Sequence, residues 1–216
     1  MLGITGHGNL VNKMLSIALL PLLGVSYASA ATIQFIVDND FAIFAGTQSS
    51  ITRQAAVYQN NVGWGSQISA AQSFNLTLLT GETTFYVLAM DGGAGGGLQG
   101  SLNGVDITSV FVMKSNDISS YLLNYSSSAS ELTAGTYNAR IQDVQTAVTF
   151  ATWVSPQIST GFFDQPAFHI GTMQANLFRL SAASVNVTAV PEPSTYGLGL
   201  GVIALAAVAL RRRKKA

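Results

Sequence analysis

Two short apolar segments, one near each end, limit the part of this chain that can fold as a water-exposed domain to residues 31–189. The first, residues 14–25, has 12 residues and is too short to cross a hydrocarbon core of about 30 Å. The second, residues 196–210, has 15 residues and as a helix would reach only roughly 22 Å. We therefore expect one folded domain between two membrane-directed ends.

Residues 1–30 have the pattern of a secretory signal peptide. Lys13 is the only cation before the apolar stretch, and Ala28-Ser29-Ala30 supplies the small residues at which signal peptidase cuts. Mature protein is then expected to begin near Ala31. The alternative is a permanent N-terminal anchor, because the polar opening is long and Pro21 interrupts the apolar stretch. Both versions place the middle of the chain on the outer side of the membrane.

The C-terminal end has three consecutive parts: a motif at residues 190–195, the apolar run at 196–210 and a basic tail at 211–215. The motif begins Val190, Pro191, Glu192, Pro193, Ser194, and the tail is Arg211, Arg212, Arg213, Lys214, Lys215. The two prolines favour extended backbone, which predicts a stiff strip that a protease can bind as a strand. Each Leu, Ile or Val of the short run contributes roughly −0.3 to −0.6 kcal/mol on insertion, so the anchor is marginal. The cations are expected to hold the C-terminus on the cytoplasmic side.

In this order the three parts resemble the PEP-CTERM family of bacterial sorting signals. The resemblance implies cleavage near Pro191-Glu192-Pro193 by an exosortase, a membrane cysteine transpeptidase-like enzyme. It also implies export across the cytoplasmic membrane of a Gram-negative-type bacterium, a transient membrane anchor, and a final place at the cell surface or in the extracellular matrix. The implied partners are signal peptidase and exosortase. An ordinary tail anchor is the alternative for an apolar run followed by cations.

The composition of the domain excludes several classes of function. Residues 31–189 carry nine acidic and four basic side chains, a net charge of −5, and this leaves no basic stripe for a nucleic-acid backbone. The chain has no cysteine, which excludes disulfides, thiolate catalysis and sulfur-ligated metals. We expect no cofactor and no metal centre.

The pattern of residues 31–189 is mainly β and predicts a single jelly-roll-like β-sandwich with one or two short helices. Ile33, Phe35 and Val37 recur at period two, which is typical of a strand with one buried face. The other expected elements are a hairpin of residues 71–79 and 84–90, a tight turn at Asn103-Gly104, a returning strand over 105–112, helices over 117–124 and from Ile141 to near Trp153, and closing strands over 178–180 and 184–190.

Four residues are the best candidates for a ligand site. Asp38, Asp40 and Asp91 lie at the ends of predicted strands, and Trp64 lies between two glycines. Residues 32–104 resemble galactose-binding-like jelly-roll modules, which implies loops at one end of the sandwich where an indole and carboxylates bind a sugar. The alternatives are that Trp64 fills the edge of the core and that the acidic turn is solvated. A calcium site is less favoured, because calcium takes six to eight oxygen ligands.

Two further features are compatible with chemistry but have ordinary explanations. Gly95, Gly97 and Gly100 satisfy the spacing of a dinucleotide-binding loop, yet no helix pattern follows, so a mobile hairpin loop is expected. His169 is the only histidine after the signal peptide, and no nucleophile motif accompanies it. We expect it in a partly exposed loop.

The domain is therefore predicted to be a non-catalytic surface or matrix protein that contacts extracellular polysaccharide. The alternative is an exported carbohydrate-active hydrolase, in which Asp38 and Asp40 would serve as acid and base. Neighbouring turn residues rarely have the required separation, which favours the first hypothesis.

Replacing Pro191 and Pro193 by alanine is expected to abolish C-terminal processing, because the double substitution removes the rigid strip that the exosortase binds. Mass spectrometry of the termini of exported protein measures this. Wild-type protein should lack residues 211–215, and the variant should retain them. Wild-type exported protein that still carries the basic tail would contradict the prediction.

Overall fold

The computed structural model describes residues 30–67, 71–93, 96–114, 117–125, 138–159, 167–187 and 205–206. The predicted signal peptide up to residue 29, the sorting motif, the basic tail and most of the predicted membrane helix lie outside these residues. Within them, no helix is both long enough and apolar enough to cross a membrane.

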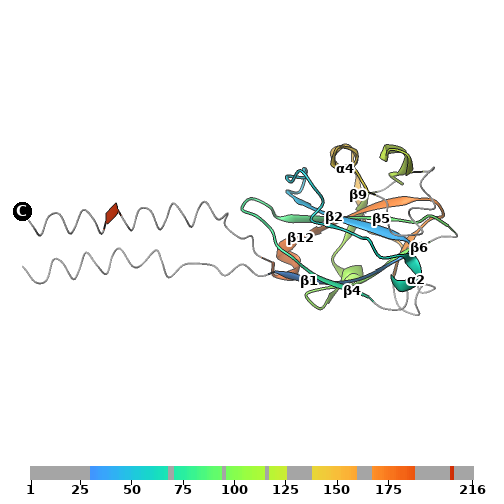
Figure 1. The fold of residues 1–216 in the computed structure, drawn as a ribbon, viewed down its shortest axis with the longest axis horizontal. Coiled ribbons are helices and arrows are strands. Elements are labelled where there is room, and N and C mark those ends of the chain that lie inside the picture. Colours follow the sequence, from blue (N-terminus) through green and yellow to red (C-terminus); the bar gives the residue numbers. More distant parts are fainter. Residues whose placement is uncertain are drawn as a thin grey trace, which may run out of the picture.

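The domain is mainly β and consists of two antiparallel six-stranded sheets with one helix layer (Figure 1). Sheet A has the order β10-β11-β6-β1-β4, with β7 paired to β6, and sheet B has the order β3-β2-β5-β12-β8-β9. The strands of sheet A are β1 (Ala31–Val37), β4 (Gln72–Leu76), β6 (Gly96–Leu102), β7 (Val105–Asp106), β10 (Ile158–Ser159) and β11 (Ala167–Ile170). The strands of sheet B are β2 (Asp40–Gly46), β3 (Tyr58–Gln59), β5 (Thr84–Met90), β8 (Val112–Lys114), β9 (Trp153–Val154) and β12 (Ala175–Ser181). The helical segments are α2 (Trp64–Gln67), α4 (Ile141–Thr149) and the 3-10 turns η2 (Ile107–Ser109), η3 (Ser119–Tyr121) and η5 (Ala182–Val185).

The two sheets pack face to face around one apolar core. On β1, Ile33, Phe35 and Val37 are fully buried between the sheets, whereas Thr32 and Gln34 face outward, as the period-two pattern predicted. Alternating apolar residues of β2 and β5 contribute the other side of this core. Sheet A thus keeps one face in contact with solvent.

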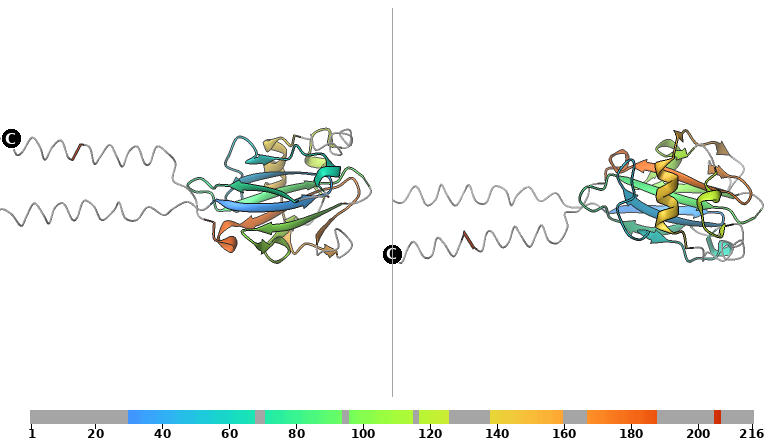
Figure 2. Two further views of the ribbon diagram at one scale, coloured as in Figure 1. Left: turned by 60° about the horizontal axis from the view of Figure 1, so that its bottom comes forward. Right: turned by 90° about the horizontal axis from the view of Figure 1, so that it is seen from above.

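Sheet B is covered on both faces. Every position of β2 and β5 is buried, because their second set of apolar side chains packs under α4 and η3 in a separate cluster. Figure 2 (right) shows α4 crossing over these strands.

The predicted helix from Ile141 is confirmed, but it ends at Thr149, and Trp153 belongs to β9. Over residues 117–124 the structure has only the single turn η3.

The predicted hairpin of residues 71–79 and 84–90 is wrong, because β4 and β5 lie in different sheets. β4 is the edge of sheet A and pairs with β1, whereas β5 lies between β2 and β12 in the middle of sheet B. The burial patterns give the physical reason. Side chains of β5 are buried on both faces, as is common for a central strand of a sheet covered on both sides, whereas β4 has exposed positions that suit an edge strand.

The glycine-rich segment is also different from the expectation. Residues 96–102 form β6, a strand between β1 and β11, and not a mobile loop. At Gly100 the φ angle is +146°, and a Cβ there would collide with the backbone oxygen of Gln34. Glycine is therefore required for close approach of the strands, and not for binding a phosphate.

Four smaller expectations can be compared with the structure. Asn103-Gly104 forms the predicted tight turn, with positive φ at both residues, between β6 and β7. Residues 105–112 are not one strand, since η2 interrupts them. Residues 182–185 form η5 and not the start of a second closing strand, whereas β12 includes the predicted strand at 178–180. His169 lies on β11 and not in a loop.

The first and last described parts of the domain meet at one end of the sandwich. Asn103 accepts a hydrogen bond from the Thr32 N–H (2.8 Å) and donates one to the Val185 carbonyl (2.8 Å). Ala31 and Val187 both belong to the core between the sheets. The chain therefore enters and leaves the domain at the same end (Figure 1).

A partly buried ion pair closes the connection between β4 and β5. Arg53 donates to both carboxylate oxygens of Glu82, at 2.7 and 2.6 Å, and the Glu82 side chain is only 3% exposed. Burial raises the pKa of Glu82, but hydrogen bonds from Arg53, Leu79 and Thr52 and the charge of Arg53 outweigh it, so the pKa is lower than the ordinary 4.5. The ionised form of Glu82 thus stabilises the fold.

The free energy of unfolding is expected to fall as the pH drops below about 4.5. Folding lowers the pKa of Glu82, so its ionised form stabilises the fold above the unfolded pKa. Protonation at lower pH removes this stabilisation. Urea denaturation between pH 3 and pH 7 should show a shallower pH dependence for Glu82→Gln than for wild type. Arg53→Met should cost about 2–3 kcal/mol at pH 7, because it leaves a buried carboxylate unpaired.

Arg140→Met is the matched control. Arg140 pairs with Asp143 at 2.6 Å, and Asp143 is largely buried and also accepts a hydrogen bond from the Leu123 N–H, but Arg140 is 54% exposed, so this variant should lose less stability than Arg53→Met. Equal losses in the two arginine variants would contradict the role assigned to Glu82.

Candidate functional site

The structure brings three of the four predicted ligand residues to the same end of the sandwich, opposite the end where the chain enters. The Asn39 N–H donates to the Met90 carbonyl (2.8 Å), and the Asn39 side chain accepts from the Gly92 N–H (2.6 Å). The turn around Asp38 and Asp40 therefore lies against the loop that begins at Asp91. A Cβ on Gly96 would collide with the Asp38 backbone oxygen, so glycine allows this contact.

The carboxylates of Asp40 and Asp91 face into the protein. Asp40 is fully buried, and its Oδ1 accepts from the Phe41 N–H (2.7 Å) and from the Asn60 amide (2.8 Å). Asp91 is 1% exposed, and its two oxygens accept from the N–H groups of Gly93 (3.1 Å) and Met173 (3.0 Å). These contacts hold loops in place. They leave the two side chains poorly placed to bind a polymer from solution.

The negative charge of Asp40 also affects the pKa of a neighbouring tyrosine, Tyr58. Burial raises the pKa of Tyr58, and the negative charge of Asp40 raises it further. Tyr58 stacks on Phe74 with ring centroids 3.9 Å apart, so it belongs to the edge of the aromatic core. Tyr58 therefore stays neutral and acts as a packing residue.

The remaining predicted residues are placed as follows. Trp64 begins the short helix α2, and its side chain lies outside the described part of the structure. His169 is exposed on β11, opposite Gly97 of β6. Among the described residues no group of three His, Cys, Asp or Glu side chains is arranged to hold a metal ion. The sorting motif and basic tail lie outside the described residues.

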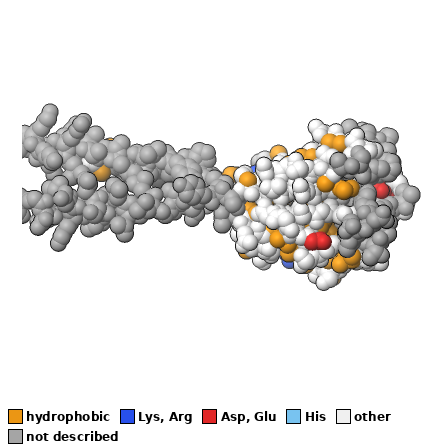
Figure 3. All heavy atoms as spheres, turned by 90° about the horizontal axis from the view of Figure 1, so that it is seen from below, with side chains coloured by type: hydrophobic (Ala, Val, Ile, Leu, Met, Phe, Trp, Pro, Cys, Tyr) orange, Lys and Arg blue, Asp and Glu red, His pale blue; other side chains and the backbone are white. Residues whose placement is uncertain are grey.

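The outer face of sheet A has a hollow of about 260 Å³ that the sequence pattern did not single out. Gln34, Gln99, Ser101 and Asp106 supply its polar lining, and Ile36 supplies an apolar patch. Neighbouring strands bring these side chains together, because Gln34 pairs with Ser101 and Ile36 pairs with Gln99 across β1 and β6. Figure 3 shows this side of the molecule, where uncharged side chains and backbone (white) predominate.

One atom of this hollow lacks a partner. The Oε1 atom of Gln99 is buried and accepts no hydrogen bond in the structure. A buried acceptor without a donor costs about 1–3 kcal/mol, so a rotation of the Gln99 side chain that turns Oε1 into the hollow would let a ligand donor recover this loss. No basic side chain lines the hollow, and Asp106 is its only acid. Such a lining suits a neutral, hydroxylated ligand.

Little in the sequence indicated that the residues of the hollow would form a site. Gln34 and Gln99 belong to no motif, and 64 positions separate them. The only available signal was the alternation on β1, which places Gln34 on the outward face.

Comparison with known families identifies the C-terminal end. The family model of the PEP-CTERM protein-sorting motif matches residues 189–214. This match confirms the resemblance seen in the proline-containing motif, the apolar run and the basic tail, and it indicates an exported protein that an exosortase sorts at the membrane. No curated protein and no solved structure matches the chain.

Asp40→Ala and Asp91→Ala are each expected to lower the free energy of unfolding by about 1–3 kcal/mol, because each leaves buried N–H donors without an acceptor. Asp91→Asn, which keeps one carbonyl oxygen, should lose less. Urea denaturation measures these differences. A rise in melting temperature on adding calcium would show that the carboxylates bind a metal and would contradict their assignment as loop supports.

Proposed function

We propose that this chain, whose residues 189–214 match the PEP-CTERM protein-sorting motif, is a non-catalytic surface or extracellular-matrix protein that binds polysaccharide. A signal peptide at residues 1–30 directs export. A membrane helix at residues 196–210 holds the protein until an exosortase cuts near Pro191-Glu192-Pro193. The released or transferred domain, residues 31–189, then contacts polysaccharide through the outer face of sheet A.

The arrangement of the ends supports this order of events. Ala31 and Val187 lie at the same end of the domain, so both membrane-directed segments are attached there. A domain attached at one end leaves the faces of its sheets accessible from the side. Among the described residues, no long helix packs on the outer face of sheet A, whereas α4 covers part of sheet B (Figure 2).

The single observation that carries the polysaccharide proposal is the hollow around Gln99. It has amide and hydroxyl groups at its surface, an apolar patch at Ile36 and a buried acceptor without a donor. Sugars present hydroxyl donors and apolar C–H faces together, which matches this lining. The hollow contains no pair of carboxylates and no histidine, so nothing in it favours hydrolysis of the polymer.

Gln34→Ala combined with Gln99→Ala is expected to weaken binding to a neutral polysaccharide by about tenfold or more, which corresponds to roughly 1.4 kcal/mol. The full-length chain in mild detergent is tested by affinity electrophoresis against dextran, laminarin and galactomannan. Ser73→Ala is the matched control, because Ser73 pairs with Gln34 on the same face but does not line the hollow. Binding that is equal in the wild type and the double variant would overturn the proposed surface.

Stability provides a second test of the same site. Removing a side chain whose buried Oε1 accepts no hydrogen bond should leave the free energy of unfolding of Gln99→Ala unchanged or slightly raised. Weaker binding together with unchanged stability would therefore locate the effect at the ligand and not in the fold.

A further inference from the structure

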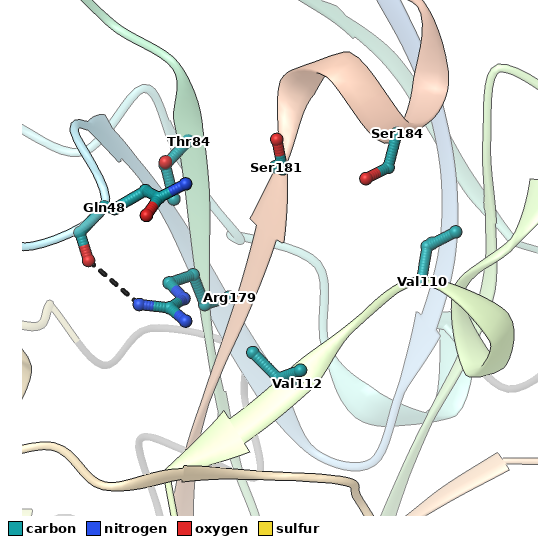
Figure 4. Close-up of a pocket in the computed structure, with 7 residues that line it drawn as sticks. All are labelled: Gln48, Thr84, Val110, Val112, Arg179, Ser181 and Ser184. Carbon is teal, nitrogen blue, oxygen red and sulfur yellow. Dashed lines mark hydrogen bonds between the residues drawn. The ribbon is translucent and has the colours of Figure 1, made fainter.

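A second pocket, on sheet B, has a different chemistry from the hollow on sheet A. It has a volume of about 160 Å³ and lies where β5, β12 and β8 extend beyond the part of the sheet that α4 covers. Its lining includes the guanidinium of Arg179, the hydroxyl groups of Thr84, Ser181 and Ser184, and Val112 (Figure 4). We call it the Arg179 pocket. None of its lining residues is acidic.

The guanidinium of Arg179 is held in place by uncharged neighbours. Its Nη1 donates to the Gln48 carbonyl (3.0 Å), and its Cζ lies 4.4 Å from the centroid of the Trp153 ring. Stacking on an indole fixes the plane of a guanidinium without using its N–H groups. Arg179 therefore presents an oriented donor set at the edge of the pocket.

Arg179 differs from the other two arginines of the described domain. Arg53 and Arg140 each pair with a carboxylate, and the two ion pairs found in the described residues are theirs. Tyr86, whose hydroxyl can ionise, is the residue opposite Arg179 on β5. Burial raises the pKa of Tyr86 to about 12 against the lowering effect of Arg179, so Tyr86 stays neutral and supplies no counter-charge.

The size and chemistry of the pocket restrict what can fill it. Pockets for whole small molecules are typically about 300–1,000 Å³, so this one accommodates a single substituent or one sugar unit of a larger molecule. A guanidinium binds a planar carboxylate through two parallel N–H···O bonds, and the neighbouring hydroxyl groups can bond to sugar hydroxyls. The remaining pocket surface at Val112 is apolar.

We infer that the Arg179 pocket binds the carboxylate of a uronic acid unit in an extracellular polysaccharide. The carboxylate part of this assignment rests on the guanidinium and its uncharged surroundings, and the sugar part rests on the proposed function. The site is distinct from the hollow on sheet A, because the two lie on opposite sides of the sandwich.

Binding of the full-length chain in mild detergent to polygalacturonate, with dextran as the neutral probe, tests the assignment, and it is measured at about 0.15 M salt so that the negative charge of the domain is screened. Arg179→Gln should weaken polygalacturonate binding by about tenfold to a hundredfold and leave dextran binding unchanged. Ser184→Asp should also weaken it, because Ser184 is exposed and its replacement adds a negative charge to the pocket without disturbing the core. Arg140→Gln removes one positive charge outside the pocket and should have no effect.

The outcomes separate this assignment from the proposed function. Binding to dextran but not to polygalacturonate would overturn the uronate site and leave the hollow on sheet A intact. Binding to polygalacturonate that Arg179→Gln leaves unchanged would also overturn it, as would competition by inorganic sulfate as strong as that by glucuronate. Arg179-dependent binding to polygalacturonate without binding to neutral polymers would support the uronate site and overturn the proposed hollow.

Discussion

Aromatic side chains that meet between the sheets hold this domain together, because a chain without cysteine has no disulfide bonds and depends mainly on apolar burial. Phe111, in the loop before β8, has its ring centroid 6.4 Å from Phe35, 6.2 Å from Phe168 and 6.4 Å from Phe178. These partners come from both sheets, so one residue joins them. Each such buried side chain contributes about 1.5–3 kcal/mol through burial. The outer surface of sheet A is then not needed for stability and can carry polar groups.

The two sheets differ in what covers them, and this difference decides where a ligand can bind. α4 packs Val144, Ala147 and Val148 onto sheet B, which removes most of that face from solvent. The part near Arg179 has a pocket. In the part of the chain that the structure describes, no long helix packs on the outer face of sheet A, where Gln34 and Gln99 line the polar hollow. A neutral site and a cationic site are thus separated by the thickness of the sandwich.

Local patterns in the sequence predicted the local features of the fold. The alternation of Ile33 and Phe35, the helical spacing from Ile141 and the Asn103-Gly104 turn each depend on neighbouring residues, and each is found. The sorting motif was identified for the same reason. Pairing between distant strands carries no such signal. The assignment of β4 and β5 to different sheets depends on the tertiary fold. The hydrogen bond between Gln48 and Arg179, which are 131 positions apart, also depends on it.

The net negative charge of the domain affects which polymers the Arg179 pocket is expected to bind. Residues 31–189 carry a net charge of −5, so a polyanion that approaches at random is repelled at low ionic strength. An acidic group gains binding free energy only where it comes within hydrogen-bonding distance of Arg179. The guanidinium is already oriented there by its contacts with Trp153 and Gln48. A polymer of mainly neutral sugars with occasional carboxylates would avoid most of the repulsion and still use the pocket. Repulsion and preorganisation together therefore favour sparsely charged polysaccharides over densely charged ones.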